Sequence, residues 1–241
     1  FNQLGMAASA IAMNGSNITT SGNQSYTGAI TLGAGTTLTG SNVTTTSLGT
    51  TIAGAGNSLA VVGNASIAGD VSNVSTVNVS GTTRLAANIS STANQTYAGA
   101  MTLGADATVL TNGSSSVITT TSTVNSDGTA RALTLNASGA TGKVVVASAM
   151  GNSAALNQLA INASAIALNG SNITTSGNQT YTGAITLGAG TTLTGSNVTT
   201  TSLGTTIAGV GNSLAVVGNA SIAGDVSNVS TVDVSGTTRL A

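Results

Sequence analysis

The sequence predicts an all-β protein, a parallel β-helix (β-solenoid) built from tandem repeats. Three observations predict this fold. Residues 1–86 recur as 156–241, and only eight of these 86 positions differ. Short runs between glycines alternate apolar and polar residues, and the chain contains no proline. Close repetition is typical of solenoids, in which each unit completes the core of its neighbour.

The repeat has an internal structure. The run at 23–34 returns at 94–105 and again, after a longer interval, at 178–189. We therefore expect residues 1–155 to form the first double repeat unit of one continuous solenoid. Residues 156–241 form a partial second copy, with no separate domains. Because there is no signal peptide at Phe1 and no initiator Met, we expect a segment of a longer protein.

The alternation indicates short strands that are buried on one face. Ile30 and Leu32 share one side of a strand and Thr31 the other, and Leu133 and Leu135 repeat the pattern. Glycines bound these runs, as tight corners require. One turn of three strands takes roughly 20 residues, so the first double unit gives seven or eight turns and the whole chain a rod of about 55 Å.

Absence of proline supports stacked strands, because every turn must both donate and accept backbone hydrogen bonds and proline cannot donate. An array of β-sandwich modules is the structural alternative. It explains less well the missing proline and the low aromatic content of 2%.

Composition argues against several functions. Charged residues make up 4% of the chain against about 25% in typical globular proteins, and the net charge is −1. That balance offers no electrostatic surface for nucleic acid. There is no His, Cys or Glu, and no apolar run is long enough for a membrane helix. Because the chain has no His or Cys and Lys143 is its sole lysine, the Ser and Thr hydroxyls lack a base that could activate them as nucleophiles.

The carboxylates are few and spaced apart along the chain. We expect no catalytic pair, no metal site, no cofactor and no enzymatic activity. They are Asp70, Asp106, Asp127, Asp225 and Asp233.

Asn-x-Ser/Thr sequons are frequent: 18 of the 24 asparagines carry Ser or Thr two positions later, against about seven expected by chance. One interpretation is glycosylation of a surface fibre. The other is that residues i and i+2 share a strand face, so solvent-facing Asn and Thr produce sequons automatically. The candidate glycosylation sites are Asn14, Asn17, Asn23, Asn42, Asn64, Asn73, Asn169, Asn172, Asn178, Asn197, Asn219 and Asn228.

Tyr26, Tyr97 and Tyr181 occupy equivalent positions in the repeats. A tyrosine ring can stack on a sugar, but packing at a corner of the coil is the favoured interpretation.

The run Gly-Asn-Gln-Thr-Tyr-Thr-Gly-Ala-Ile-Thr-Leu-Gly-Ala at 177–189, followed by Thr191-Thr192-Leu193, resembles the repeats of filamentous-haemagglutinin-type large exoproteins and autotransporter passengers. The segment 156–175 shares the resemblance, which covers essentially the whole chain. It implies a right-handed β-helix, secretion across the outer membrane by a two-partner or autotransporter route, and adhesion or matrix building. This sequence has no Arg-Gly-Asp triplet.

We therefore expect a structural or adhesive extracellular fibre segment, such as a filament, a sheath, an adhesin stalk or part of a biofilm matrix. It would be secreted or held at the cell surface. The expected partners are further copies, associated end to end or laterally, and host or matrix glycans, but not nucleic acid. The alternative function is a glycan- or surface-binding module on the same solenoid, for a host receptor or, less favoured, for ice.

Overall fold

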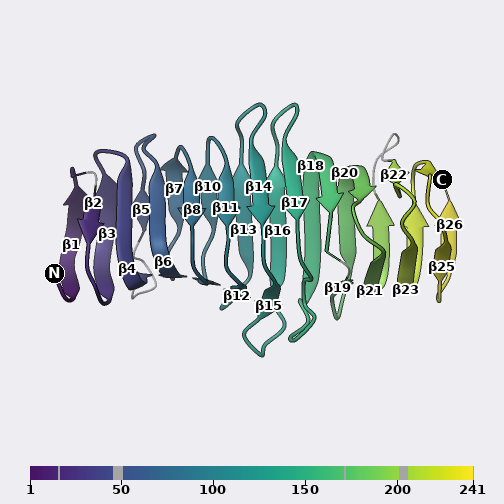
Figure 1. The fold of residues 1–241 in the computed structure, drawn as a ribbon, viewed down its shortest axis with the longest axis horizontal. Helices are drawn as coiled ribbons and strands as arrows, with labels where there is room; N and C mark the ends of the chain where they lie inside the picture. The colour runs from purple at the N-terminus through teal and green to yellow at the C-terminus, as the bar shows by residue number, and fades with distance from the viewer. Residues whose placement is uncertain (16, 46–50, 171, 201–205, 241) are drawn as a thin grey trace.

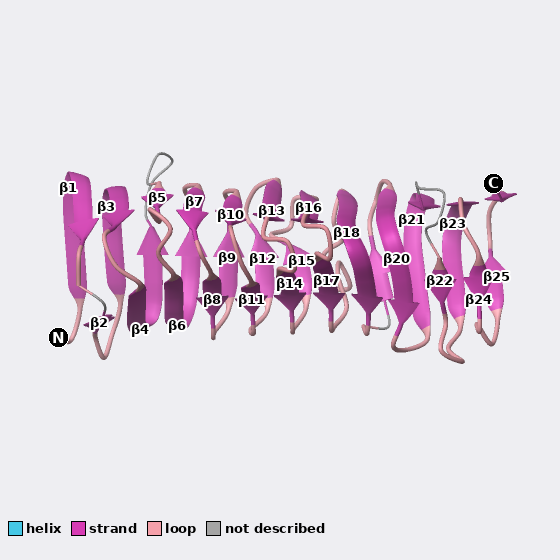
Figure 2. Ribbon diagram, turned by 90° about the horizontal axis from the view of Figure 1, so that it is seen from above, coloured by secondary structure: helices cyan, strands magenta, loops and turns pink. Residues whose placement is uncertain are grey.

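A computed structural model describes residues 1–15, 17–45, 51–170, 172–200 and 206–240. In this part of the chain all regular structure is strand, so no helix is present that could cross a membrane. Figures 1 and 2 show a single rod whose strands lie side by side along one axis, with the two ends of the chain at opposite ends. The predicted parallel β-solenoid is confirmed, with about 11 turns.

The strands are short, as the spacing of the glycines predicts. In chain order they are β1 (Leu4–Met13), β2 (Asn17–Thr19), β3 (Gln24–Leu32), β4 (Thr36–Thr45), β5 (Ile52–Ala53), β6 (Leu59–Ile67), β7 (Val71–Val74), β8 (Val77–Val79), β9 (Thr83–Leu85), β10 (Ile89–Ser91), β11 (Gln95–Tyr97), β12 (Met101–Leu103), β13 (Ala107–Thr111), β14 (Val117–Thr120), β15 (Val124–Ser126), β16 (Ala132–Ala137), β17 (Lys143–Val146), β18 (Gln158–Leu168), β19 (Asn172–Thr174), β20 (Gln179–Leu187), β21 (Thr191–Thr200), β22 (Ile207–Ala208), β23 (Leu214–Ile222), β24 (Val226–Ser227), β25 (Val232–Val234) and β26 (Thr238–Leu240).

The pairing between these strands is parallel, and it sorts them into three columns that run along the rod. The first column includes β9, β12 and β15, the second β7, β10 and β13, and the third β8, β11 and β14. Within each turn the chain passes from the first column to the second and then to the third. Longer strands such as β3 and β6 bend between two columns and pair in both.

The core consists of apolar side chains that stack turn upon turn inside the coil. In the second column each inward residue pairs in register with the next, and all of them are buried. This stack is Ile11, Ile30, Ile52, Val71, Ile89, Val109, Leu135 and Ile161. Burying one such side chain contributes about 1.5–3 kcal/mol, so many small increments along the axis stabilise the rod.

Glycine corners allow the long strands to bend. Gly28 and Gly63 have φ of 125° and 129°, a region that L side chains rarely adopt. A Cβ on Gly63 would lie 1.8 Å from the carbonyl oxygen of Gly40 one turn below. The strand register shifts at both corners, where one fewer residue spans the bend. Glycine is required there by both conformation and contact.

Turns differ in length along the rod. They are short where Leu59 pairs with Val77 and Val77 with Gln95. They are longer in the middle, where Ala107 pairs with Leu133. The sequence predicts only an average number of residues per turn, whereas in the structure this number increases at the centre of the rod. The additional residues lie in loops between strands.

The sequence repeat and the structural turn are out of step. Tyr26 lies in the first column, paired between Met6 and Thr45. Tyr97 lies in the third column, and Tyr181 in the second. From one tyrosine to the next the chain makes three complete turns and then crosses two further columns. This holds for the shorter and the longer repeat alike, so each repeat is rotated by a third of a turn from the one before.

Candidate functional site

The predicted sequon asparagines lie on the outside of the rod. Eleven of the twelve are exposed, and Asn64 is half-buried. The serines that complete the sequons of Asn14 and Asn169, Ser16 and Ser171, lie outside the described residues. The sites are thus at the surface, and they are not gathered into one pocket.

Several of these asparagines form a ladder along one corner of the coil, just before the first column. Asn42 Nδ2 donates to Asn23 Oδ1 at 2.9 Å, and Asn64 Nδ2 donates to Asn42 Oδ1 at 3.2 Å. Asn64 Oδ1 in turn accepts the backbone N–H of Thr82 at 2.9 Å. The amide groups therefore hold successive turns in register.

The second copy of the repeat builds the same ladder a third of a turn away, before the second column. Asn197 donates to Asn178 at 2.9 Å and Asn219 to Asn197 at 3.2 Å, and the Thr237 N–H reaches Asn219 Oδ1 at 3.0 Å. These two sets are called the asparagine ladders below. Their Nδ2 atoms, which would carry a glycan, already serve as hydrogen-bond donors at four positions.

Strand geometry accounts for the sequon pattern at these positions. In β4 the side chains of Asn42 and Thr44 both face outward while Val43 between them is buried. Two outward polar residues at i and i+2 therefore arise without any selection for modification. Glycosylation stays a prediction.

The tyrosines sit inside the coil, each in a buried hydrogen-bond network. Tyr97 Oη donates to Gln95 Oε1 at 2.7 Å. Gln95 Nε2 donates to the Leu110 carbonyl at 2.6 Å and to Ser91 Oγ at 2.9 Å. The same arrangement recurs at Tyr26–Gln24 and Tyr181–Gln179, both at 2.7 Å. Through the glutamine amide, each network ties one turn to the next.

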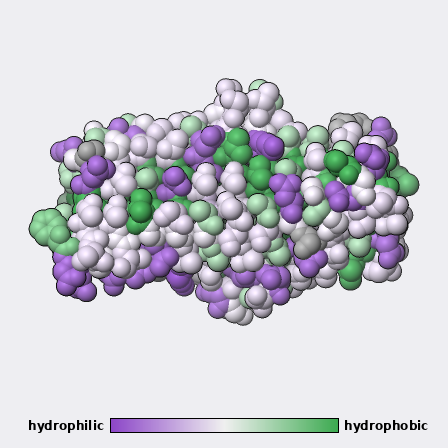
Figure 3. All heavy atoms as spheres, in the orientation of Figure 1, coloured by the Kyte–Doolittle hydropathy of each residue, from purple (hydrophilic) through white to green (hydrophobic). Residues whose placement is uncertain are grey.

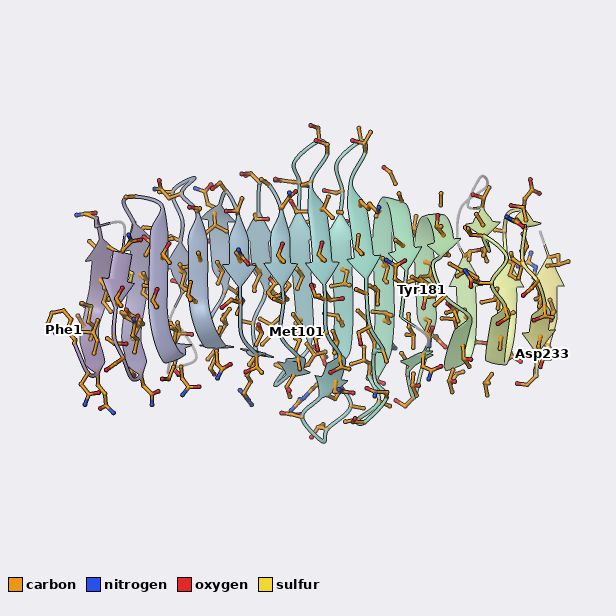
Figure 4. All side chains as sticks on the ribbon, viewed as in Figure 1. Phe1, Met101, Tyr181 and Asp233 are labelled. Carbon is orange, nitrogen blue, oxygen red and sulfur yellow. The ribbon has the colours of Figure 1, made fainter. Side chains whose placement is uncertain are left out.

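Burial decides between the two interpretations of the tyrosines. The side chains of Tyr26, Tyr97 and Tyr181 are at most 1% exposed, and Figure 4 shows Tyr181 within the body of the rod. Burial raises the pKa of Tyr26 to about 12 and also raises the pKa values of Tyr97 and Tyr181. A ring with no exposed face has none to offer a sugar, so these tyrosines pack the core.

Two of the carboxylates serve the backbone. Asp70 accepts the N–H of Asn88 at 2.9 Å, and Asp106 accepts that of Ala132 at 2.8 Å. Each holds a corner of the coil to the turn above. The described residues hold no cluster of three acidic, His or Cys side chains that could bind a metal ion.

One charged cluster marks the middle of the rod. Asp127 accepts Arg131 Nε at 3.2 Å and lies 3.7 Å from Arg84 Nη2. The hydrogen bond from Arg131 lowers the pKa of Asp127, helped by the Thr129 N–H and the charge of Arg84. These groups fix the loop that joins β15 to β16. The negative charge of Asp127 offsets the positive charge of one of the two guanidinium groups. The cluster therefore creates no strong electrostatic field.

The feature that sequence reasoning missed is a protruding ledge at the centre. It consists of loops 112–116 and 138–142, which rise side by side between β13 and β14 and between β16 and β17 (Figure 1). The Thr141 N–H donates to the Ser114 carbonyl at 2.8 Å, and Ser164 Oγ donates to the Ala140 carbonyl at 2.7 Å. The ledge is therefore an ordered stack, and it stands out from the surface in Figure 3.

A polar hollow of about 200 Å³ lies at the base of the ledge, lined by residues 92–94 and 113–116. Hydroxyls, an amide and backbone line it, and no charged side chain takes part. A groove of about 290 Å³ lies on the same turns, over β7, β10 and β13. Its lining includes Ser72, Ser90, Thr108 and, as its one carboxylate, Asp70. The longer of the two repeat intervals, from 94 to 178, was the available sequence signal for the ledge.

Comparison with known proteins gives no relatives. No protein-family model matches the chain, and neither a curated protein nor a solved structure shows significant similarity to it.

Proposed function

We propose that this chain is a structural segment of an extracellular fibre, a rod that spaces or displays adhesive surface and has no catalytic role. The observation that carries the proposal is the continuous coil. About 11 turns share one core and one system of parallel pairing. Such a rod grows by adding repeats without changing its cross-section. The resemblance to exoprotein repeats supports secretion and surface display.

The third-of-a-turn rotation between repeats favours a fibre over a flat binding surface. Equivalent groups face three directions in succession, so a rod can contact neighbours on every side. Binding to ice would need the same threonine rows on one face turn after turn, and the rotation removes that regularity. We therefore expect no thermal hysteresis from the purified chain.

Length is the property to measure. The double repeat unit spans seven turns and one further column, and therefore adds about 35 Å at ~4.8 Å per turn. A variant with one additional double unit should be longer by that amount in electron micrographs and in small-angle scattering, with unchanged width. Equal lengths, or a broadening of the particle, would contradict the proposal. The same micrographs distinguish single rods from end-to-end polymers and lateral bundles.

Adhesion is tested separately. Beads coated with the chain should adhere to host cells or abiotic surfaces more than beads coated with an unrelated solenoid of similar size.

The intact mass of material from the native source tests whether the sequon asparagines carry glycans. A mass equal to that of the bare polypeptide would remove the glycan prediction and leave the rod proposal unaffected.

The hollow beside the ledge favours a second candidate, a module that binds a neutral glycan. The hollow measures about 200 Å³, and a separate groove of about 290 Å³ lies on the same turns. The uncharged hydroxyl and amide groups of the hollow suit a polyhydroxylated, uncharged ligand. Replacing Ser114 and Ser115 with alanine should abolish chemical-shift changes on titration with neutral oligosaccharides, whereas Ser25→Ala on β3 should not. Absence of any shift in the unmodified chain would sink this candidate.

A further inference from the structure

The ledge contains an asparagine–glycine pair, Asn112–Gly113, at the start of its first loop. Asn112 is exposed, and its backbone N–H is held by the Ser91 carbonyl at 3.2 Å. The Gly113 N–H donates no hydrogen bond within the described residues. Gly113 also has no Cβ, so no side chain of its own shields its nitrogen. An exposed carboxamide therefore stands next to an uncommitted backbone nitrogen.

We propose that Asn112 is a site of spontaneous deamidation in the folded rod. The Gly113 nitrogen loses its proton to solvent and attacks Asn112 Cγ. The Cγ–Nδ2 bond breaks, ammonia leaves, and a five-membered succinimide forms. Water then opens one of its two carbonyls. The product is aspartate, or isoaspartate when the backbone is rerouted through the former side chain. The net reaction consumes one water and releases one ammonia.

The consequences are local and change the chemistry of the ledge. A negative charge appears beside a hollow that has no charged lining residue. Isoaspartate adds one backbone atom to loop 112–116, whose Ser114 carbonyl must meet the Thr141 N–H. The modification therefore disturbs the stacking of the two loops. It does not depend on the proposed function of the rod.

The second copy of the repeat supplies a matched control, Asn169–Gly170. Gly170 is buried, and its N–H donates to the Val146 carbonyl at 3.2 Å. The same dipeptide is thus present, but its attacking nitrogen, that of Gly170, already donates a hydrogen bond. For Gly170 to react, this hydrogen bond must first open. The equivalent pair in the first copy, Asn14–Gly15, does not match it, because Gly15 is exposed whereas Gly170 is buried.

The test is peptide mapping by mass spectrometry after incubation of the full chain at pH 7.4 and 37 °C. Aspartate and isoaspartate should accumulate at Asn112 at least about tenfold faster than at Asn169, the factor that an opening cost of ~1.4 kcal/mol produces. In denaturant the two rates should converge. Asn112→Ser should remove the product from the ledge and leave the slow reaction at Asn169 unchanged. Equal rates at the two sites in the folded chain, or a faster rate at Asn169, would overturn the proposal.

Discussion

Removing one buried hydroxyl should measurably weaken the rod, because it leaves an acceptor without a partner. Tyr97→Phe deletes the Oη that donates to Gln95 Oε1 at 2.7 Å, and both residues are at most 1% exposed. Water cannot reach the orphaned oxygen. An unsatisfied buried acceptor costs about 1–3 kcal/mol, and we expect a loss of that size in the free energy of unfolding.

Urea denaturation followed by far-ultraviolet circular dichroism measures this loss as a shift in midpoint at constant slope. Tyr181→Phe provides a matched replicate, since Tyr181 donates to Gln179 at 2.7 Å in the same way. A double-mutant cycle with Gln95→Ala isolates the pair, and a coupling energy of about 0.5–3 kcal/mol is expected. Losses below about 0.5 kcal/mol at both tyrosines would refute the reasoning. They would show that the glutamine oxygens do not depend on the hydroxyls.

The same structure makes four other predictions about stability and shape. Burial raises the tyrosine pKa values, to about 12 for Tyr26. The stabilisation that tyrosine burial provides should therefore be fully present below the unfolded-state pKa of ~10. As pH rises through the folded-state pKa values, the free energy of unfolding should fall by up to ~1.4 kcal/mol per pH unit for each tyrosine. Urea titrations at a series of pH values measure this fall and should show none between about pH 7 and 9. Val210 has φ of 51°, which is strained for a β-branched residue, so Val210→Gly should raise the unfolding free energy by about 1 kcal/mol, and more than Ala55→Gly at the equivalent position. Asn42→Ala interrupts an asparagine ladder and should cost about 1 kcal/mol in the same assay, while an outward serine replacement such as Ser25→Ala should cost less than about 0.5 kcal/mol. Spin labels at residues 25 and 96, and at 96 and 180, should lie farther apart than the ~18 Å of axial rise between neighbouring repeats; distances equal to this axial rise would place the repeats on one face and contradict the rotation.

The candidate surface features could be foreseen only in part. Glycine at the corners was readable, because tight turns restrict the residue types that fit. The longer repeat interval from 94 to 178 indicates additional residues but not the ledge that they form, since loop residues such as Ser114 and Thr141 carry no periodic signal. These two residues lie far apart in sequence, yet the Thr141 hydroxyl donates to the Ser114 carbonyl at 3.1 Å one turn away. Only the register of the coil brings them together.

The sequence by itself determined the kind of fold. Alternation in runs such as 30–32 and 133–135, the near-identical copies and the absence of proline each favour stacked parallel strands. Tertiary structure alone decided how the sequence repeat is aligned with the turns of the coil, so that each repeat is rotated by a third of a turn from the one before. How many residues complete a turn depends on where corners close against the turn below, as Gly63 does against Gly40. That closure is a contact between residues distant in sequence. It places Tyr26, Tyr97 and Tyr181 in three different columns although their local sequences are nearly the same.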